Sequence, residues 1–256
     1  MAPAAASPAA SATSATPSIY LIAAHPDWNE SRVNRRLLET AKAVANLSHQ
    51  PSPGHRQDHL SGHGGQPATA APRVDIQDLY ATYADYCIDV PAEQARVAAA
   101  QLIVLMHPIQ WYAMPALQKL WLDEVLTYGW AYGAVSSATG DNAAAPANAP
   151  GTALRGKDLW LVATTGGQEE SYHPESYNRY FFDAFLPPYE QTASLCGMRF
   201  LPPLILHGAH SVGRDAVAAH TETFRQHLLT YPAWAGPETR AYEALRRTGP
   251  GIAEAV

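Results

Sequence analysis

The stretch Leu102-Ile103-Val104-Leu105-Met106-His107-Pro108-Ile109-Gln110-Trp111-Tyr112 decides the fold of this chain. It opens over 102–106 with apolar and mostly branched side chains, which predict a strand buried on both faces of a parallel sheet. The run then breaks at Pro108 into an amide and two aromatic rings, and Pro115 suits the first turn of a following helix. Open α/β sheets bind ligands at strand ends that deliver such side chains into a loop. The stretch therefore predicts one wall of a ligand site.

Charge and composition exclude several classes of protein. The chain has 256 residues, a formal net charge of −6 and a pI near 6.0, whereas a nucleic-acid binder would carry a clustered basic face. No apolar run approaches the roughly 20 residues that span a bilayer. The two cysteines, Cys87 and Cys196, are too few for a disulfide framework. They favour a reducing compartment, so we expect a cytoplasmic protein.

Composition also divides the chain into segments. Residues 1–17 are rich in Ala, Pro, Ser and Thr and lack the basic start of a secretory signal, so they predict a disordered leader. Two polar tracts, 48–72 and 134–152, predict disordered insertions within a domain that spans 18–230, and we expect 231–256 to be a C-terminal tail. The remainder has the size of a single α/β domain.

The first polar tract contains four histidines, His49, His55, His59 and His63. Their spacing is irregular, and the residues between them are mainly Pro, Gly, Ser and Gln. This composition favours disorder over a metal cluster. We therefore expect no metal site.

Apolar runs and helical periodicity alternate along the rest of the chain. Strands are predicted over 18–24, 73–80, 102–106, 157–164 and 200–206. Helices are predicted from Ser31 through Val44, over 91–100 and 117–125, through the aromatic segment 177–185, from there to Cys196-Gly197, and over 217–228. This alternation predicts an α/β fold, a doubly wound five-stranded parallel sheet with helices on both faces.

Three strand exits carry side chains with binding chemistry. Residues 31–34, at a helix start with open backbone amides, suit a phosphate group. Trp111-Tyr112 offers flat apolar area, and Gly166-Gly167 lets main chain approach a ring closely because no Cβ intervenes. Plainer interpretations are a structural His25, an aromatic pair in the core and a glycine turn. The coincidence of these features at exits on one sheet edge favours a flavin pocket.

Several of these motifs resemble those of a known family. They are His25-Pro26, His107-Pro108-Ile109-Gln110-Trp111-Tyr112, Pro115, Lys119-Leu120-Trp121, Gly129-Trp130-Ala131-Tyr132-Gly133 and Thr164-Thr165-Gly166-Gly167. From about Ile19 to Leu229 the chain resembles the flavodoxin-like NAD(P)H:quinone oxidoreductases. Within that family it looks most like the bacterial ancillary subunits of glutathione-regulated, Kef-type potassium-efflux antiporters.

The resemblance implies a flavodoxin-like fold, a homodimer and non-covalent FMN, with FAD in relatives that have longer chains. It implies two-electron reduction of quinones by NAD(P)H in a ping-pong reaction, in which hydride passes through flavin N5. It also implies a membrane potassium-efflux antiporter as a partner, which the protein would reach from the cytoplasm as a peripheral subunit.

Matched by position, the resemblance implies site residues as well. It places His25, Ser31, Arg32, Val33 and Asn34 around the flavin phosphate and ribityl chain. It places Ile109, Gln110, Trp111 and Tyr112 beside the ring, and Thr164, Thr165, Gly166 and Gly167 over its pyrimidine side.

Two further residues are implied as a catalytic pair. In quinone reductases of this family, a tyrosine and a histidine downstream of the Thr-Thr-Gly-Gly turn help to take up charge or protons during hydride transfer. Tyr172 stands at the offset of the tyrosine, but the offset of the histidine falls on Asn178, and the nearest candidate is His173. We therefore expect Tyr172 as a hydrogen-bond donor and His173 as a cation. The alternative is that both residues cap a loop.

Two alternatives to an enzyme remain open. One is a regulatory subunit that binds FMN but acts by docking on a membrane antiporter. The other is a flavodoxin-type electron carrier, which the lack of a Ser/Thr/Gly-rich phosphate loop after the first strand disfavours. Co-purification with a transporter favours the first alternative, and accumulation of a one-electron semiquinone favours the second. Rapid NAD(P)H oxidation with a quinone favours the enzyme.

Overall fold

The computed structural model describes residues 16–48, 71–133 and 151–236. Parts of four predicted segments lie outside the described residues. They are the leader up to residue 15, the first insertion over 49–70 with its four histidines, the second insertion over 134–150, and the tail from 237 onward. At the inner boundaries of these segments, Thr152 is buried, and Tyr231 and Ala235 pack into the core. The packed domain therefore continues past residue 230.

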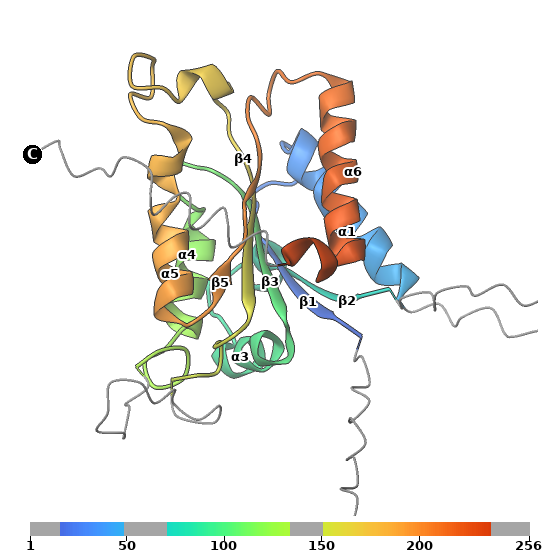
Figure 1. Cartoon of the computed structure of the whole chain (residues 1–256), viewed down its shortest axis with the longest axis vertical. Coiled ribbons are helices and arrows are strands. Elements are labelled where there is room, and N and C mark those ends of the chain that lie inside the picture. The colour runs from blue at the N-terminus through green and yellow to red at the C-terminus, as the bar shows by residue number, and fades with distance from the viewer. Residues whose placement is uncertain (1–15, 49–70, 134–150, 237–256) are drawn as a thin grey trace, which may run out of the picture.

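A parallel sheet forms the centre of the molecule (Figure 1). Its strands are β1 (Ser18–Ala23), β2 (Arg73–Asp78), β3 (Leu102–Pro108), β4 (Asp158–Thr164), β5 (Arg199–Phe200) and β6 (Leu204–Leu206). They run in the order β2-β1-β3-β4-β5, and β6 also pairs with β4. All the pairs are parallel. The predicted fold, a doubly wound α/β sheet of flavodoxin order, is confirmed.

The predicted fifth strand, 200–206, is two short strands in the structure. The register of β4 against β5 differs by one residue from its register against β6. Pro202 and Pro203 lie in the gap, and proline has no N–H group to donate to a strand ladder. The carbonyl of Pro202 instead accepts a hydrogen bond of 3.1 Å from Nε1 of Trp160. In the part of the chain that the structure describes, the sheet therefore has six strands rather than five.

Helices cover both faces of the sheet, as predicted (Figure 1). Helices α3 (Val90–Ala99), α4 (Ala116–Val125) and α5 (Pro187–Leu195) lie on one face, and α1 (Arg32–Leu47) and α6 (Arg214–Thr230) lie on the other. The connections contain the short turns α2 (Leu79–Thr82), η1 (Glu169–Ser171), η2 (Phe182–Phe185) and η3 (Ala233–Ala235). Within the described residues, no helix is long and apolar enough to span a membrane.

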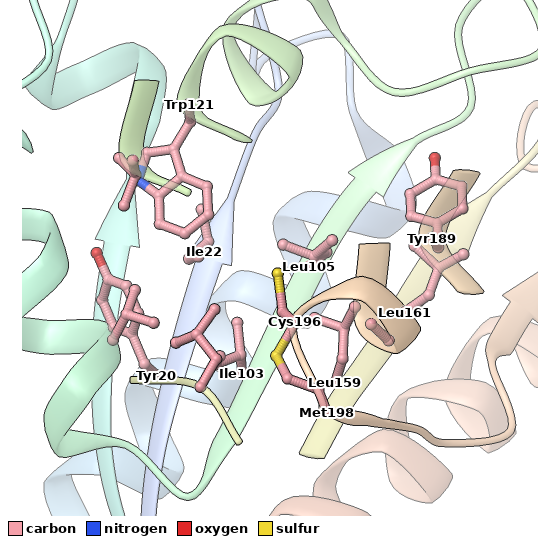
Figure 2. Close-up of a cluster of buried hydrophobic side chains, with 14 of the residues drawn as sticks. Tyr20, Ile22, Ile103, Leu105, Trp121, Leu159, Leu161, Tyr189, Cys196 and Met198 are labelled. Atoms are coloured by element: carbon pink, nitrogen blue, oxygen red, sulfur yellow. The ribbon is translucent and has the colours of Figure 1, made fainter. Parts of the chain in front are cut away.

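Two apolar layers hold the helices on the sheet. On one face, Ile22 of β1 and Leu105 of β3 pack in a cluster with Trp121 of α4 and Tyr189 of α5 (Figure 2). The opposite face presents residues such as Leu21 to α1 and α6. Successive side chains of a strand point to opposite faces, so an unbroken apolar run supplies both layers. The core thus fixes the strands whose exits form the site.

The predicted helix over the aromatic segment 177–185 is wrong. The chain there is irregular and contains only the single turn η2. Arg179 has a φ of +61°, which a right-handed helix does not allow. The rings of Tyr177 and Tyr180 are exposed rather than packed against the sheet. The next helix, α5, begins at Pro187.

Candidate functional site

The exits of β1, β3 and β4 meet at one edge of the sheet. Ala24, directly after β1, donates its backbone amide to the carbonyl of Met106 in β3 at 2.9 Å. Ile109, directly after β3, donates to the carbonyl of Thr164 at the end of β4 at 2.7 Å. Parallel strands end on the same side of their sheet, so these exits open into one region. The structure therefore brings the three predicted loops together.

The first exit leads through His25 into α1. Nδ1 of His25 accepts a hydrogen bond of 3.1 Å from the backbone amide of Asp27, and its ring lies 5.3 Å from the ring of Trp28. Burial lowers the pKa of His25, and the nearby Asp27 opposes this effect. Ser31 is the buried N-cap of α1, but its side chain makes no capping bond. The first-turn amides of α1 are thus open to an anionic acceptor.

Arg32 has a contact that the prediction did not include. Its guanidinium donates to the carbonyl oxygens of Ala209 at 3.1 Å and Val212 at 2.6 Å. A phosphate would have to share or replace these bonds, because guanidinium donors point in fixed directions. The structure therefore assigns Arg32 first to joining α1 to the loop before α6.

Val33 and Asn34 face the interior. Val33 is buried in the core, so only its backbone is available at the exit. Asn34 donates Nδ2 to Oγ1 of the buried Thr164 at 2.8 Å, and its Oδ1 is buried without a hydrogen-bond partner among the described residues. A buried amide oxygen without a donor costs free energy unless a ligand or a water supplies one. Asn34 therefore links the first and third exits.

The second exit turns sharply through Trp111 and Tyr112. Gln110, which is exposed, and Ala113 exchange two backbone hydrogen bonds of 2.8 and 3.0 Å across the turn. The φ angles of Trp111 and Tyr112 are +48° and +64°, a left-handed conformation that is costly for these residues and clusters at functional sites. Trp111 is 94% exposed, whereas Tyr112 stacks on Phe185 with ring centroids 5.3 Å apart. The turn thus holds two aromatic rings outward.

A hydroxyl and two glycines shape the third exit. The buried Thr165 donates Oγ1 to the carbonyl of Gly167 at 2.7 Å. A Cβ added to Gly167 would lie 2.8 Å from Oγ of Ser171, whereas one added to Gly166 would meet only the ring of His210, at 3.5 Å. Among the described residues, the backbone amides of Gly166 and Gly167 have no acceptor. These amides are open donors at the exit.

A pocket of about 360 Å³ opens beside the second and third exits. Its lining residues are Ile109, Trp111, Tyr112, Gly167, Ser171, Tyr172, Tyr177 and Asn178. The volume is typical of small-molecule sites, and the walls are largely aromatic. The first exit contributes none of these lining residues; it is joined to the other two exits by the bonds of Ala24 to Met106 and of Asn34 to Thr164.

The structure brings only one member of the expected catalytic pair to the pocket. Tyr172 lines it, whereas His173 is exposed and packs its ring edge-on against Phe181, with centroids 4.9 Å apart. Asn178, at the spacing where the histidine was expected, lines the pocket and accepts a hydrogen bond of 3.3 Å from the hydroxyl of Tyr112. An amide does not ionise, so Asn178 cannot act as a cation. The geometry gives no support to the role expected of His173.

His207 is a site residue that the sequence interpretation missed. It follows β6 directly, and its Nδ1 lies 2.9 Å from Oγ1 of Thr165. Its ring centroid lies 5.2 Å from that of Tyr172. Burial lowers the pKa of His207, while Glu169 and Glu170 partly oppose the effect. The fifth apolar run ends at this histidine, but only the pairing of β6 with β4 reveals that it lies behind the pocket.

The donors at these exits fit a flavin mononucleotide. The uncapped start of α1 suits its phosphate, and the open amides of Gly166 and Gly167 suit the carbonyl oxygens of its pyrimidine ring. The aromatic pocket offers the flat apolar surface that its ring system needs. A Cβ at position 166 would fit within the packing of the protein, so the fold alone does not require a glycine there. A ligand that occupies the space beside residue 166 would account for the glycine.

Comparison with known sequences gives a consistent result. A family model described as flavodoxin-like fold matches residues 17–229. The glutathione-regulated potassium-efflux system ancillary protein KefF of Salmonella schwarzengrund is 36% identical over 213 residues, which make up 83% of this chain and 96% of that protein.

The solved structures that match this chain share its fold but are named as different kinds of protein. General stress protein 14 of Treponema denticola, in complex with FMN, matches with a TM-score of 0.63 and 27% identity, over 83% of this chain and 98% of that chain. A thermophilic tryptophan halogenase from Streptomycin violaceusniger matches with a TM-score of 0.63 and 31% identity, over 82% and 98%. An NADPH-quinone reductase from P. pentosaceus has a TM-score of 0.58 at 21% identity, over 84% and 99%, and shows the shared fold alone.

Proposed function

Because this chain belongs to the flavodoxin-like fold family, we propose that it is an FMN-dependent NAD(P)H:quinone oxidoreductase. One observation carries the proposal: the pocket at the exits of β3 and β4 is walled by Trp111, Tyr112 and Tyr172 beside the open amide of Gly167. A flavin ring and a quinone are both flat and largely apolar, with a few carbonyl oxygens that need donors. The pocket offers both kinds of surface.

Each exit has a proposed part in holding FMN. The phosphate is assigned to Ser31 and the first-turn amides of α1, and the ribityl chain to the same exit beside His25 and Asn34. The ring is assigned to the turn 109–112 and to the backbone of 166–167. When bound, FMN supplies a two-electron carrier that takes hydride from NADH or NADPH and gives it to a quinone.

Tyr172 is the proposed proton donor to the quinone. A quinone that receives a hydride also needs a proton to become a hydroquinone, and a donor must lie in the pocket. The phenol of Tyr172 lines the pocket and is largely buried. Burial raises the pKa of Tyr172, and a contact with Thr165 partly opposes this. The phenol therefore keeps its proton at neutral pH until a substrate takes it.

The similarity to KefF favours a second role. We propose that the protein also serves as a cytoplasmic ancillary subunit of a potassium-efflux antiporter, because a 36% identical relative that it matches nearly end to end carries that description. Large exposed rings at the pocket, Trp111 at 94% and Tyr177 at 85%, favour a homodimer in which a second copy covers them. Neither role excludes catalysis.

The test is quinone reduction by the FMN-loaded protein without oxygen. We expect NADH or NADPH to bleach the flavin absorbance and a benzoquinone to restore it. Tyr172→Phe should slow the restoration about 100-fold and leave bleaching unchanged. Tyr86→Phe, at a tyrosine outside the pocket lining, is the matched control and should behave as wild type.

The outcomes separate the candidate functions. Bound FMN that neither nucleotide bleaches contradicts an enzyme and favours a regulatory subunit, for which co-purification with an antiporter is the next test. A one-electron semiquinone that accumulates during reduction favours a flavodoxin-type carrier.

A further inference from the structure

The residues between β6 and α6, 207–213, lie along the third exit, and we call them the 207–213 loop. The backbone amides of Gly208 and Ala209 donate to the carbonyls of Gly167 and Thr165, each at 2.8 Å. Two main-chain hydrogen bonds thus fix the start of the loop to the exit of β4. The loop is a further wall of the candidate site.

A side-chain contact strengthens this attachment. Gln168 donates Nε2 to Oγ of Ser211 at 2.5 Å. A Cβ on Gly208 would overlap Oε1 of Gln168, and the φ of Gly208 is +65°, so glycine is the residue that suits this position. Gln168 therefore packs directly on the loop that it holds.

The first exit holds the other side of the 207–213 loop. Arg32, the first residue of α1, donates to the carbonyls of Ala209 at 3.1 Å and Val212 at 2.6 Å. His210 lies between these two residues in the sequence. The loop therefore bridges the first and third exits, and His210 is part of the bridge.

The ring of His210 lies beside the third exit. A Cβ on Gly166 would lie 3.5 Å from both Cδ2 and Nε2 of this ring. His210 is exposed, and neither of its ring nitrogens makes a hydrogen bond to the described residues, 16–48, 71–133 and 151–236. The imidazole is thus free to donate to a ligand at this edge of the sheet.

The charges of the first exit leave a phosphate there short of cations. A phosphate monoester carries about two negative charges at pH 7, and Asp27 and Glu30 add negative charge to the segment before α1. Arg32 donates to the 207–213 loop instead. Burial lowers the pKa of His25, so its ring is mainly neutral at pH 7. A further N–H donor from the loop would therefore stabilise a phosphate at the start of α1.

We propose that His210 binds the phosphate of FMN by donating from Nε2, together with Ser31 and the open amides of the first turn of α1. The inference rests on the proposed function, because it assigns one more residue to the proposed cofactor. The flavin ring is assigned to 166–167 and the phosphate to α1, and the 207–213 loop connects these two places. Nε2 of an imidazole carries a proton in one neutral tautomer and in the charged form, so it can donate at neutral pH.

Two flavins separate a phosphate contact from a ring contact. FMN and riboflavin share the ring system and the ribityl chain, and only FMN has the phosphate. Fluorescence titration of the flavin-free, full-length chain at pH 7 measures the Kd for each flavin. His210→Ala removes the donor, and His210→Glu replaces it with a negative charge. His173→Ala is the matched control, at an exposed histidine whose ring packs on Phe181.

We expect His210→Ala to raise the Kd for FMN about tenfold, the loss of one hydrogen bond to a charged group, and to change the Kd for riboflavin less than about twofold. His210→Glu should raise the Kd for FMN further, by at least about 30-fold, because two negative charges then face each other. His173→Ala should bind both flavins as wild type. Urea unfolding should be unchanged in all three variants, since both histidines are exposed.

The inference is overturned if His210→Ala weakens both flavins equally, because the imidazole would then contact the ring or the ribityl chain. It is also overturned if neither His210 variant weakens FMN more than riboflavin. A wild-type chain that binds neither flavin would overturn the proposed function together with this inference. The titration decides the contact of His210 even if neither NADH nor NADPH reduces the bound FMN.

Phosphorus-31 NMR of the FMN-loaded protein gives a second readout that does not depend on activity. The phosphate signal of bound FMN should move in His210→Ala and keep its wild-type position in His173→Ala. A signal that stays in place in His210→Ala would contradict a contact between the imidazole and the phosphate.

Discussion

The side-chain amide of Asn34 donates to the hydroxyl of Thr164 across 2.8 Å, and both residues are buried. Asn34 lies in the first turn of α1, and Thr164 is the last residue of β4. The bond therefore joins the helix start proposed for the flavin phosphate to the strand exit proposed for the flavin ring. We therefore expect the two halves of the proposed site to depend on one another.

Asn34→Ala tests this dependence. We expect the Kd for FMN to rise about tenfold and the free energy of unfolding to fall by about 1–2 kcal/mol, because the hydroxyl of Thr164 loses a buried partner. Fluorescence titration with FMN and urea unfolding measure the two effects. Thr40→Ala is the control on the same helix, since its hydroxyl bonds only to the carbonyl of Arg36 at an exposed position. Equal FMN affinity in both variants would argue against the link.

Gly166→Val tests the third exit. A Cβ at this position would meet only the ring of His210, at 3.5 Å, so the flavin-free protein should fold normally. The added side chain should occupy space assigned to the ring and lower the flavin content of the purified protein by at least about tenfold. Gly213→Ala, with open space around the new Cβ, should keep full flavin content. Unchanged flavin content in Gly166→Val would show that the ring lies elsewhere.

Trp111→Ala tests the aromatic turn. The ring is 94% exposed in a single copy of the chain, so its removal should change the free energy of unfolding of that single copy by less than about 0.5 kcal/mol. We expect the KM for a quinone to rise about tenfold instead, because the ring supplies flat apolar surface at the pocket. Steady-state kinetics and urea unfolding separate the two outcomes. A large loss of stability with an unchanged KM would mean that the ring serves the fold and not the site.

The stability of the flavin-free protein should fall in mild acid. His107 is fully buried in β3, and burial lowers its pKa from 6.5 to about 4. His220 in α6 has its pKa lowered to about 4 for the same reason. Between pH 6.5 and 4 the unfolded chain binds more protons than the folded chain. The free energy of unfolding therefore falls as the pH is lowered, by up to about 1.4 kcal/mol per pH unit for each histidine.

Urea unfolding at pH 7 and pH 5 measures this loss. His107→Gln removes one of the two buried imidazoles, so we expect the difference between the two pH values to shrink in this variant. An unchanged difference would mean that the ring of His107 is not shielded from protons in the folded state.

The centre of the sheet could be predicted from the sequence because β1, β3 and β4 are short, mainly apolar runs. The run 102–106 is buried on both faces of the sheet, and only a central parallel strand combines this burial with such a short length. The exit residues were predictable for the same reason, since parallel strands end on one edge. Trp111 and Gly167 meet at the pocket as that rule requires.

The rest depended on interactions between residues far apart in the sequence. The aromatic residues of 177–185 have helical spacing, but the segment is irregular: Arg179 has a left-handed φ of +61°, and the rings of Tyr177 and Tyr180 are exposed. His207 comes into contact with Thr165 because β6 slips by one residue past a pair of prolines. No local pattern encodes either arrangement.

The absorbance spectrum of the purified protein tests the central claim most directly. Three strand exits that hold a flavin predict a yellow protein with a band at about 450 nm, and FMN released in equal molar amount on denaturation. A folded, colourless protein that takes up neither FMN nor FAD when either is added in excess would contradict the account.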